Sequence, residues 1–338
     1  MTLHEKVCQL FIVSPESITH VSAVVAAGET TRAALEEYPV GGFLYSRKNL
    51  QSQAQVSTML AAVQSYASIP LFLTCDEEGG RVNRLMSTIG TTWIGPMLDY
   101  KDQGPDTARQ NAATIAADLS ACGFNMDLAP VADVWSNPEN TVIGDRAYSD
   151  SFQQAAQLVA AAVEGFHTGG VAAVLKHFPG HGDTTADSHD GPAYVTQTLD
   201  ALRNRELLPF SAGIQAGADA VMAGHLIVSD LDSTPAPFSY PIITQLLREE
   251  LGFHGVIMTD SLEMRAITDH YTSAQAAVQA VNAGVDILLC PANLPAAVEG
   301  LTQAVESGAL SQARLDESVM RILTLKRDRG ILTVPQTP

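Results

Sequence analysis

The sequence predicts an α/β protein folded as one (β/α)8 TIM barrel, a single domain over residues 1–338. Short apolar runs rich in Val, Ile, Leu and Phe alternate eight times with longer, alanine-rich amphipathic stretches. This alternation is typical of parallel strands joined by helices. Polar residues follow most of the apolar runs, as expected where a barrel gathers its functional groups. No Pro/Gly/Ser-rich linker divides the chain. An open, doubly wound sheet would give a similar alternation and is the alternative fold.

The expected strands are the short apolar runs, which lie at Gln9–Val13, Gly42–Tyr45, Pro70–Cys75, Asn125–Leu128, Val171–His177, Ala220–Ala223, Gly255–Asp260 and Asp286–Cys290. The stretches between them show apolar residues at helical spacing. The expected helices include Gln51–Tyr66, Thr107–Cys122, Ser151–Thr168, Asp200–Ala216, Pro241–Leu251 and Ser273–Ala283, with a last helix from Ser311. Each strand is thus followed by helical sequence before the next strand begins, as a parallel barrel requires.

Composition limits the function. A net charge of −18 and a pI near 4.7, with no basic stripe, argue against a nucleic-acid partner. No apolar run of about 18 to 20 residues is present, so no membrane span is expected. Four scattered cysteines beside apolar stretches predict buried free thiols. We therefore expect a monomer in the cytoplasm, or a secreted protein if a signal peptide preceded Met1.

Chemically active side chains occur just after the expected strands. They are Asp76, Arg81 and Arg84 after the third strand, Asp133 and Arg146 after the fourth, Lys176 to His189 after the fifth, His225 after the sixth and Asp260 at the seventh. Taken singly, each has an ordinary structural explanation as a helix cap or an ion pair. In a barrel, however, the carboxyl ends of all strands meet at one face. The sequence therefore predicts that these side chains share one site.

Five motifs occur in the order seen in one enzyme family. They are D-E-E-G-G-R-V from Asp76, G-D-R-A-Y from Gly144, K-H-F-P-G-H-G-D-T from Lys176, D-S-H from Asp187 and M-T-D-S-L-E-M from Met258. By these motifs the chain resembles glycoside hydrolase family 3, from Leu3 to Leu325, and within it the single-domain bacterial type that removes N-acetylglucosamine. The combination of K-H-F-P-G-H-G-D with D-S-H carries most of the specificity.

The resemblance implies a retaining hydrolase that removes non-reducing terminal β-linked N-acetylglucosamine. Asp260 matches the family's nucleophile, a role that suits a carboxylate beside a developing positive charge. His189 matches the acid/base, and an imidazole titrates near operating pH. Asp187 matches the carboxylate that orients this imidazole. The expected catalytic residues are therefore Asp260, His189 and Asp187.

The resemblance also implies a sugar-binding shell without a metal or a cofactor. By motif position, this shell consists of Asp76, Arg84, Arg146, Lys176 and His177. Charged groups suit this role because their hydrogen bonds to hydroxyls are strong. Arg81 and His181 are expected to hold loops instead, Arg81 by pairing with an acid such as Glu78 and His181 by bonding backbone. Glu263 is expected to be structural rather than an acid/base.

Several different functions remain compatible with the sequence. The histidines and aspartates between His177 and His189 could bind zinc, although their spacing matches no familiar metal signature. A β-glucosidase or β-xylosidase of the same family is a second alternative, although the D-S-H motif favours N-acetylglucosamine. Phosphate could also replace water as acceptor, because an imidazolium would not repel that anion as a carboxylate would. A carbohydrate-binding or sensory protein that has lost catalysis is the remaining alternative. The substrate could be a muropeptide or a chitin oligosaccharide, and peptidoglycan turnover is the expected context by analogy alone.

Overall fold

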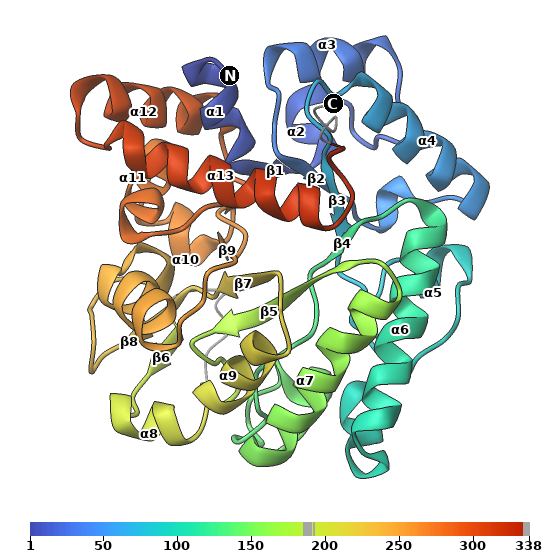
Figure 1. The fold of residues 1–338 in the computed structure, drawn as a ribbon, viewed down its shortest axis with the longest axis vertical. Helices are drawn as coiled ribbons and strands as arrows, with labels where there is room; N and C mark the ends of the chain where they lie inside the picture. Colours follow the sequence, from blue (N-terminus) through green and yellow to red (C-terminus); the bar gives the residue numbers. More distant parts are fainter. Residues whose placement is uncertain (185–190, 192, 334–338) are drawn as a thin grey trace, which may run out of the picture.

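The computed structural model describes residues 1–184, 191 and 193–333, which form a barrel of parallel strands ringed by helices (Figure 1). Around the sheet the strands are β10 (Leu288–Leu289), β1 (Phe11–Val13), β2 (Gly42–Leu44), β3 (Phe72–Cys75), β4 (Met126–Asp127), β5 (Ala172–Phe178), β7 (Ala220–Ala223) and β9 (Val256–Thr259). A parallel bridge between Met258 and Ile287 joins β9 back to the start of β10. The expected TIM barrel is confirmed, with all eight strands inside or overlapping the expected runs.

The strands form where the sequence is apolar without alternation, because both faces of a barrel strand are covered. All seven residues of β5 are buried, as are all four of β3, β7 and β9. Side chains from these strands fill the barrel, and their outer faces pack on the helices. This rigid core fixes the positions of the residues that follow each strand.

The helices fill the intervals between strands. They are α1 (Leu3–Gln9), α2 (Pro15–Thr19), α3 (Glu29–Glu37), α4 (Gln53–Tyr66), α5 (Leu85–Ile89), α6 (Pro105–Cys122), α7 (Phe152–Thr168), α8 (Leu199–Asn204), α9 (Leu207–Gln215), α10 (Arg265–Thr268), α11 (Ser273–Ala283), α12 (Leu294–Ser307) and α13 (Gln312–Asp328). Short 3-10 helices, η1 to η4, lie at Arg47–Asn49, Met97–Gln103, Gly144–Arg146 and Ala236–Phe238. Several ends carry ordinary capping signals. Thr272 and Gln275 form a capping box at α11, which ends at Gly284 with φ of 117°.

Three local features differ from the expected elements. The segment expected as an α-helix at Pro241–Leu251 is a π-helix, η5, over Pro241–Glu250. The expected helix Asp200–Ala216 is divided into α8 and α9. A second sheet of two parallel strands, β6 (Ala193–Val195) and β8 (Leu226–Val228), links the segments that follow β5 and β7. This sheet was not expected, because it forms where two segments that follow different barrel strands meet in space.

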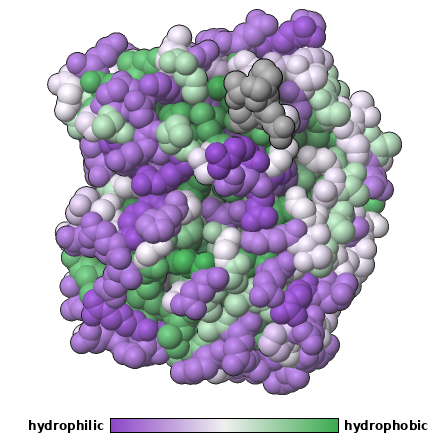
Figure 2. Space-filling view, in the orientation of Figure 1, coloured by the Kyte–Doolittle hydropathy of each residue, from purple (hydrophilic) through white to green (hydrophobic). Residues whose placement is uncertain are grey.

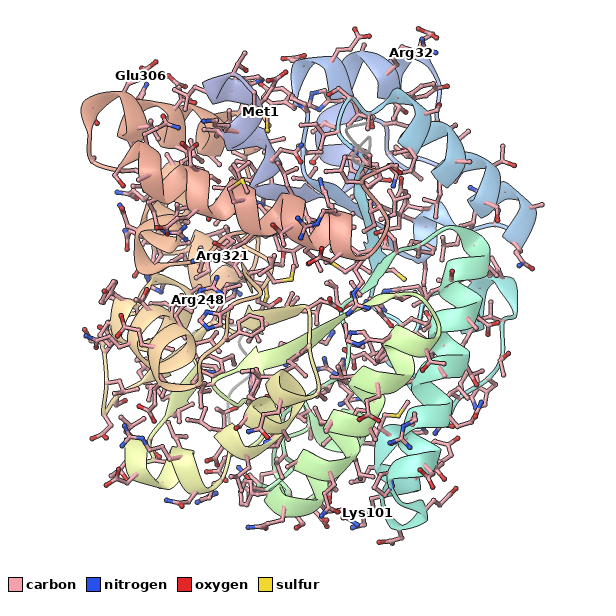
Figure 3. The ribbon with its side chains drawn as sticks, in the orientation of Figure 1. Met1, Arg32, Lys101, Arg248, Glu306 and Arg321 are labelled. Atoms are coloured by element: carbon pink, nitrogen blue, oxygen red, sulfur yellow. The ribbon has the colours of Figure 1, made fainter. Side chains whose placement is uncertain are left out.

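Helix α13 crosses the amino-terminal end of the barrel and lies in the foreground of Figure 1. Its Ser318 and Arg321 bond the carboxylate of Asp286, which precedes β10, at 2.7 and 3.1 Å. Arg248 of η5 binds the same carboxylate, and Figure 3 shows Arg248 and Arg321 close together in projection. The fully buried Lys326 bonds Gln9 at 2.8 Å. Polar contacts therefore attach the last helix to the strand beginnings.

The surface in this orientation is mostly hydrophilic, with small hydrophobic patches between the helices (Figure 2). The expected free thiols are confirmed, because Cys8, Cys75, Cys122 and Cys290 are all buried and unpaired. Over the described residues, no helix is both long and apolar enough to cross a membrane.

Candidate active site

A cavity of about 280 Å³ opens at the carboxyl ends of the strands. Six of the expected site residues line it: Asp76, Arg84, Arg146, Lys176, His177 and Asp260. They come from four different segments of the chain, since they follow or end β3, β4, β5 and β9. The carboxyl ends of these strands meet around the barrel axis, so side chains far apart in sequence converge here.

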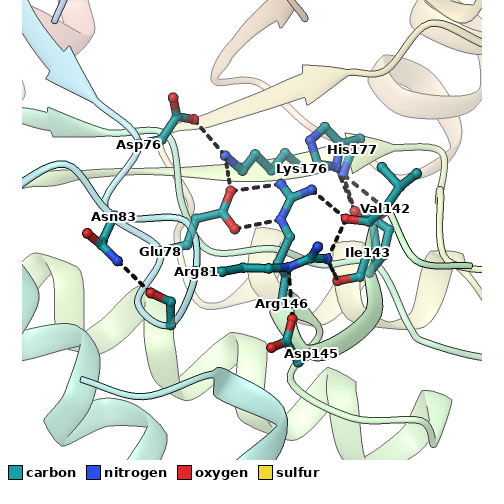
Figure 4. A network of polar contacts seen from close by, with 12 residues as sticks. Asp76, Glu78, Arg81, Asn83, Val142, Ile143, Asp145, Arg146, Lys176 and His177 are labelled. Carbon is teal, nitrogen blue, oxygen red and sulfur yellow. Dashed lines mark hydrogen bonds and ion pairs between the residues drawn. The ribbon is translucent and has the colours of Figure 1, made fainter. Parts of the chain in front are cut away.

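Alternating charges line the inner wall of the cavity (Figure 4). Lys176 Nζ lies 2.9 Å from Asp76 Oδ1 and 2.5 Å from Glu78 Oε1. Arg84 binds the other oxygen of Asp76 at 3.0 Å. Arg146 binds Glu78 through two parallel contacts of 2.8 Å, a geometry that fixes its guanidinium plane. Four of the five residues expected to bind the sugar, Asp76, Arg84, Arg146 and Lys176, therefore belong to one ion-pair network that is joined through Glu78. The fifth, His177, pairs with Asp133 instead.

The network keeps its members charged. Burial alone would raise the pKa of Glu78, but the charges of Arg146 and Lys176 outweigh burial and hold it well below its usual range. The pKa of Asp76 is lowered in the same way, because Lys176 and Arg84 outweigh its burial. Burial would lower the pKa of Lys176, yet Glu78 and Asp76 raise it. Fixed charges of both signs thus face the cavity.

Glu77, between these two acids, has a different role. Its carboxylate accepts hydrogen bonds from the backbone N–H groups of Arg84, Leu85 and Met86 at 2.5, 2.8 and 3.0 Å. These are the unpaired donors at the start of α5, where a carboxylate is favourable. Glu77 therefore positions the backbone of Arg84 beside Asp76.

Asp260 directly follows β9 at the edge of the cavity. Its Oδ1 accepts the N–H of Ser261 at 2.7 Å. Burial would raise the pKa of Asp260, but His177 and His225, together with the Ser261 N–H, lower it. Asp260 makes no Lys or Arg ion pair among the contacts of the described residues. This carboxylate is therefore ionised near neutral pH and open towards the cavity.

Two expectations about neighbouring residues need correction. Arg81 pairs with Asp145 at 2.9 Å, not with Glu78, because Arg146 and Lys176 already surround Glu78. Arg81 still holds a loop, since it donates to three successive carbonyls from Thr141 to Ile143. Glu263 lies exposed in the turn before α10 and lines the cavity, whereas a structural role was expected.

His181 also lines the cavity, and its ring contacts the Thr184 hydroxyl at 2.7 Å. Its backbone N–H donates to the side-chain carboxylate of Asp133 at 2.6 Å, which holds the residue in place. The expected bond from the His181 side chain to the backbone is a different interaction and stays a prediction. The predicted acid/base His189 and its partner Asp187 lie outside the described residues. Among the described residues, no group of three or more His, Cys, Asp and Glu side chains is arranged to hold a metal ion.

A closed parallel barrel with an open carboxylate and a set of fixed polar groups around a small cavity is the arrangement typical of barrel enzymes for small polar substrates. Comparisons with known proteins agree with this class. The model of the glycosyl hydrolase family 3 N-terminal domain matches residues 2–325. The chain belongs to glycosyl hydrolase family 3.

Relatives resemble nearly the whole chain. It is 37% identical over 322 residues to a β-hexosaminidase A of Pseudoalteromonas piscicida and spans 54% of that protein, about half its length. It is 36% identical over 296 residues to a β-hexosaminidase of Nitrosomonas eutropha, covering 85% of this chain and 84% of the relative. A solved β-N-acetylglucosaminidase of family 3 from Paenibacillus sp. FPU-7 matches all of this chain with a TM-score of 0.93 and 39% identity. This chain covers 65% of that one.

Proposed function

We propose that this protein is a retaining exo-β-N-acetylglucosaminidase with Asp260 as its nucleophile. The observation that supports the proposal best is the ionised Asp260 carboxylate, open towards a cavity whose inner acids, Asp76 and Glu78, are held in ion pairs. Attack of Asp260 on the anomeric carbon would form a glycosyl ester, which water then cleaves to regenerate the carboxylate. The names of the family 3 relatives support N-acetylhexosamine as the sugar.

The cavity suits a single sugar ring at the end of a chain. Its volume of about 280 Å³ lies just below the usual range for drug-sized ligands, as a site for one ring requires. Asp76, Arg84, Lys176 and His177 offer both donors and acceptors to ring hydroxyls, and charged partners strengthen such bonds. Because these groups are fixed before the substrate arrives, little ordering is required on binding. Arg146 is proposed to contribute mainly through Glu78, which occupies its guanidinium.

The proton transfers are assigned to His189, with Asp187 as its partner, on the resemblance to the family alone. His189 would protonate the leaving oxygen in the first step and remove a proton from water in the second. His189→Ala should therefore slow cleavage of a natural disaccharide by orders of magnitude. An activated aryl glycoside, whose leaving group needs no proton, should lose much less. Equal losses on both substrates would contradict the acid role.

A panel of 4-nitrophenyl β-glycosides of N-acetylglucosamine, glucose and xylose tests the specificity. We expect the N-acetylglucosaminide to be cleaved with the highest kcat/KM. Proton NMR of the first product should show the β-anomer before mutarotation, as retention requires. An α-anomer as first product would contradict the covalent mechanism. No turnover of any member would favour a non-catalytic binding protein.

Metal-dependent hydrolysis and phosphorolysis are tested by additions to the same assay. Loss of activity with a chelator, restored by zinc, would support a metal-dependent hydrolase. In phosphate buffer, a sugar 1-phosphate in place of the free sugar would identify a phosphorylase. We expect neither result, because the proposed mechanism needs only protein groups and water.

The proposed biological role is turnover of peptidoglycan fragments, with muropeptides as substrates and chitin oligosaccharides as the alternative. Comparing kcat/KM for a disaccharide that carries muramic acid with that for chitobiose decides between them. We also propose a monomer, for which light scattering gives the test. A cytoplasmic location is proposed from the four buried thiols.

A further inference from the structure

Asp133 lies directly behind the wall of the cavity and is almost fully buried, at 1% exposure. The chain beyond β4 continues beside β5, because Val131 forms a parallel bridge with Lys176. The Ala132 N–H also donates to the Lys176 carbonyl at 2.6 Å. This continuation carries Asp133 to the end of β5, next to His177.

The Asp133 carboxylate accepts hydrogen bonds from three N–H groups. They are the backbone N–H of His177 at 3.1 Å, the His177 ring Nδ1 at 2.7 Å and the backbone N–H of His181 at 2.6 Å. Burial alone would raise the pKa of Asp133, but the His177 ring outweighs burial and lowers it. The carboxylate is therefore ionised and acts only as an acceptor. The proton on Nδ1 of His177 must then point to Asp133.

This arrangement leaves Nε2 as the ring nitrogen of His177 available to the cavity that the residue lines. The neighbouring backbone is fixed as well, because Gly182 packs against Val134 so closely that a Cβ on Gly182 would lie 1.7 Å from the Val134 carbonyl oxygen. Asp133 thus connects the end of β5 to the beginning of the segment after it. A freely rotating or differently protonated ring would present the wrong nitrogen to a bound molecule.

We propose that Asp133 is a positioning residue of the active site, which fixes the tautomer and orientation of His177 so that Nε2 binds a substrate hydroxyl. The proposal rests on the proposed glycosidase function. Asp133 itself touches no substrate. The carboxylate also holds the backbone of His181, but its effect on turnover is proposed to pass through the ring of His177. This distinguishes the role from that of a carboxylate that merely stabilises the loop.

The first test is Asp133→Asn, which keeps the size of the side chain and removes its charge. With 4-nitrophenyl N-acetyl-β-glucosaminide we expect kcat/KM to fall roughly 10- to 100-fold, as when carboxylates behind metal-bound histidines are replaced. The matched control is Asp219→Asn at the amino-terminal end. There the carboxylate of Asp219 bonds His167 Nε2 and the Ala173 N–H, both at 2.9 Å, and none of these three residues lines the cavity. This control should lower the melting temperature and leave kcat/KM unchanged.

A double-mutant cycle tests whether the effect passes through His177. In a His177→Ala background, Asp133→Asn should lower kcat/KM by less than about twofold further, because the ring that it orients is gone. A substrate lacking the hydroxyl that His177 binds, found among the 3-, 4- and 6-deoxy sugars, should be insensitive to Asp133→Asn. Nitrogen-15 NMR of the histidine rings gives a readout without turnover. The His177 signals are assigned with the His177→Ala variant. In Asp133→Asn they should change from those of the Nδ1–H tautomer to those of a mixture of the two tautomers.

The proposal would be overturned by an unchanged kcat/KM in Asp133→Asn, by a full loss that persists in the His177→Ala background, or by unchanged His177 ring signals. A folded Asp133→Asn protein that loses activity equally on every deoxy sugar would also contradict it. If the unaltered protein cleaved no N-acetylglucosaminide at all, the proposed function would fail instead. The ring signals would still report on Asp133 in that case.

Discussion

Each end of the barrel contains a buried aspartate bound to a histidine, and the two pairs differ in what surrounds the ring. At the carboxyl end, Asp133 binds His177, whose ring lines the cavity. At the amino end, Asp219 binds His167 of α7 and also Arg329, which follows α13, at 2.7 Å. The amino-terminal pair joins helices to the start of β7. The same interaction therefore orients a cavity-lining ring at one end and attaches helices at the other.

The ion-pair clusters of the two ends show the same contrast. Asp76 and Glu78 share Lys176 at the cavity, and a neighbouring open carboxylate, Asp260, completes that end. At the amino end, three arginines surround the fully buried Asp286. Replacing residues at the cavity should therefore change turnover most, and replacing residues at the amino end should change stability most.

The largest expected effect is that of Asp260→Asn. It removes the carboxylate that would attack the sugar, so kcat/KM should fall by at least about 10³-fold. The melting temperature should stay within a few degrees, because Asp260 makes no ion pair with Lys or Arg among the described contacts. Steady-state kinetics and calorimetry measure the two effects. A large fall in stability with unchanged turnover would reverse the contrast between the ends.

Glu78→Ala should lower both turnover and stability. It leaves Lys176, which is 2% exposed, and Arg146 without their shared carboxylate. Breaking a buried ion pair in this way costs about 3–5 kcal/mol of unfolding free energy. Turnover should fall as well, because Lys176 and Arg146 lose their fixed positions. Urea unfolding together with kcat/KM would show whether the cavity end also supports the fold, and an effect on neither would contradict the network.

Asp286→Asn should lower stability with little effect on kcat/KM per folded molecule. It leaves Arg248, Arg314 and Arg321 close together without their common anion, and we expect a loss of about 3 kcal/mol. Urea unfolding gives the measurement. A loss of turnover that exceeds the loss of folded protein would show that the two ends are coupled.

Lys326→Met tests the amino end through pH. Burial lowers the pKa of Lys326 from 10.5 to about 7, so the unfolded chain binds this proton more strongly than the folded one. Lys326 therefore lowers the free energy of unfolding by its full amount below about pH 7, where it is charged in both states. This loss of stability shrinks as the pH rises from 7 towards 10.5. The methionine variant should be the more stable form near pH 6, and the difference should shrink by about pH 10. If the difference in stability did not depend on pH, folding would not lower the pKa of Lys326.

The smallest expected effect is that of Arg81→Ala, at the rim of the cavity. The pair with Asp145 is exposed on both sides, and such pairs contribute about 1 kcal/mol or less. The carbonyl contacts should matter more, because Val142 lines the cavity. We expect a KM increase of a few-fold with kcat nearly unchanged. A fall in kcat as large as that of Asp260→Asn would mean that this loop takes part in the chemistry.

The barrel could be predicted because its strands are buried on both faces and therefore read as continuous apolar runs. The β6–β8 sheet could not, since pairing of Ala193 with Leu226 depends on two loops meeting in space. The π-helix η5 has the same apolar spacing as an α-helix over its ten residues. Its difference lies in backbone hydrogen bonding, which the residue pattern does not specify.

The site could be predicted as a set of residues but not as a set of pairs. Strand-end positions and motifs placed Asp76, Lys176 and Asp260 at one cavity. Which arginine binds Glu78 depends on the path of the Thr141–Arg146 loop, and the sequence offers two candidates in similar motifs. The sequence predicted Asp133 as an acid that follows a strand but not its pairing with His177, because His177 lies 44 positions away.

The position of helix α13 also indicates how the protein could be immobilised. Lys326 bonds Gln9, and Asp316 binds Lys6 at 2.6 Å, so the first and last helices lie together at the end remote from the cavity. A solid support joined to the outer side of these helices would leave the mouth of the cavity facing the solution. An immobilised preparation oriented in this way should keep free access for oligosaccharides.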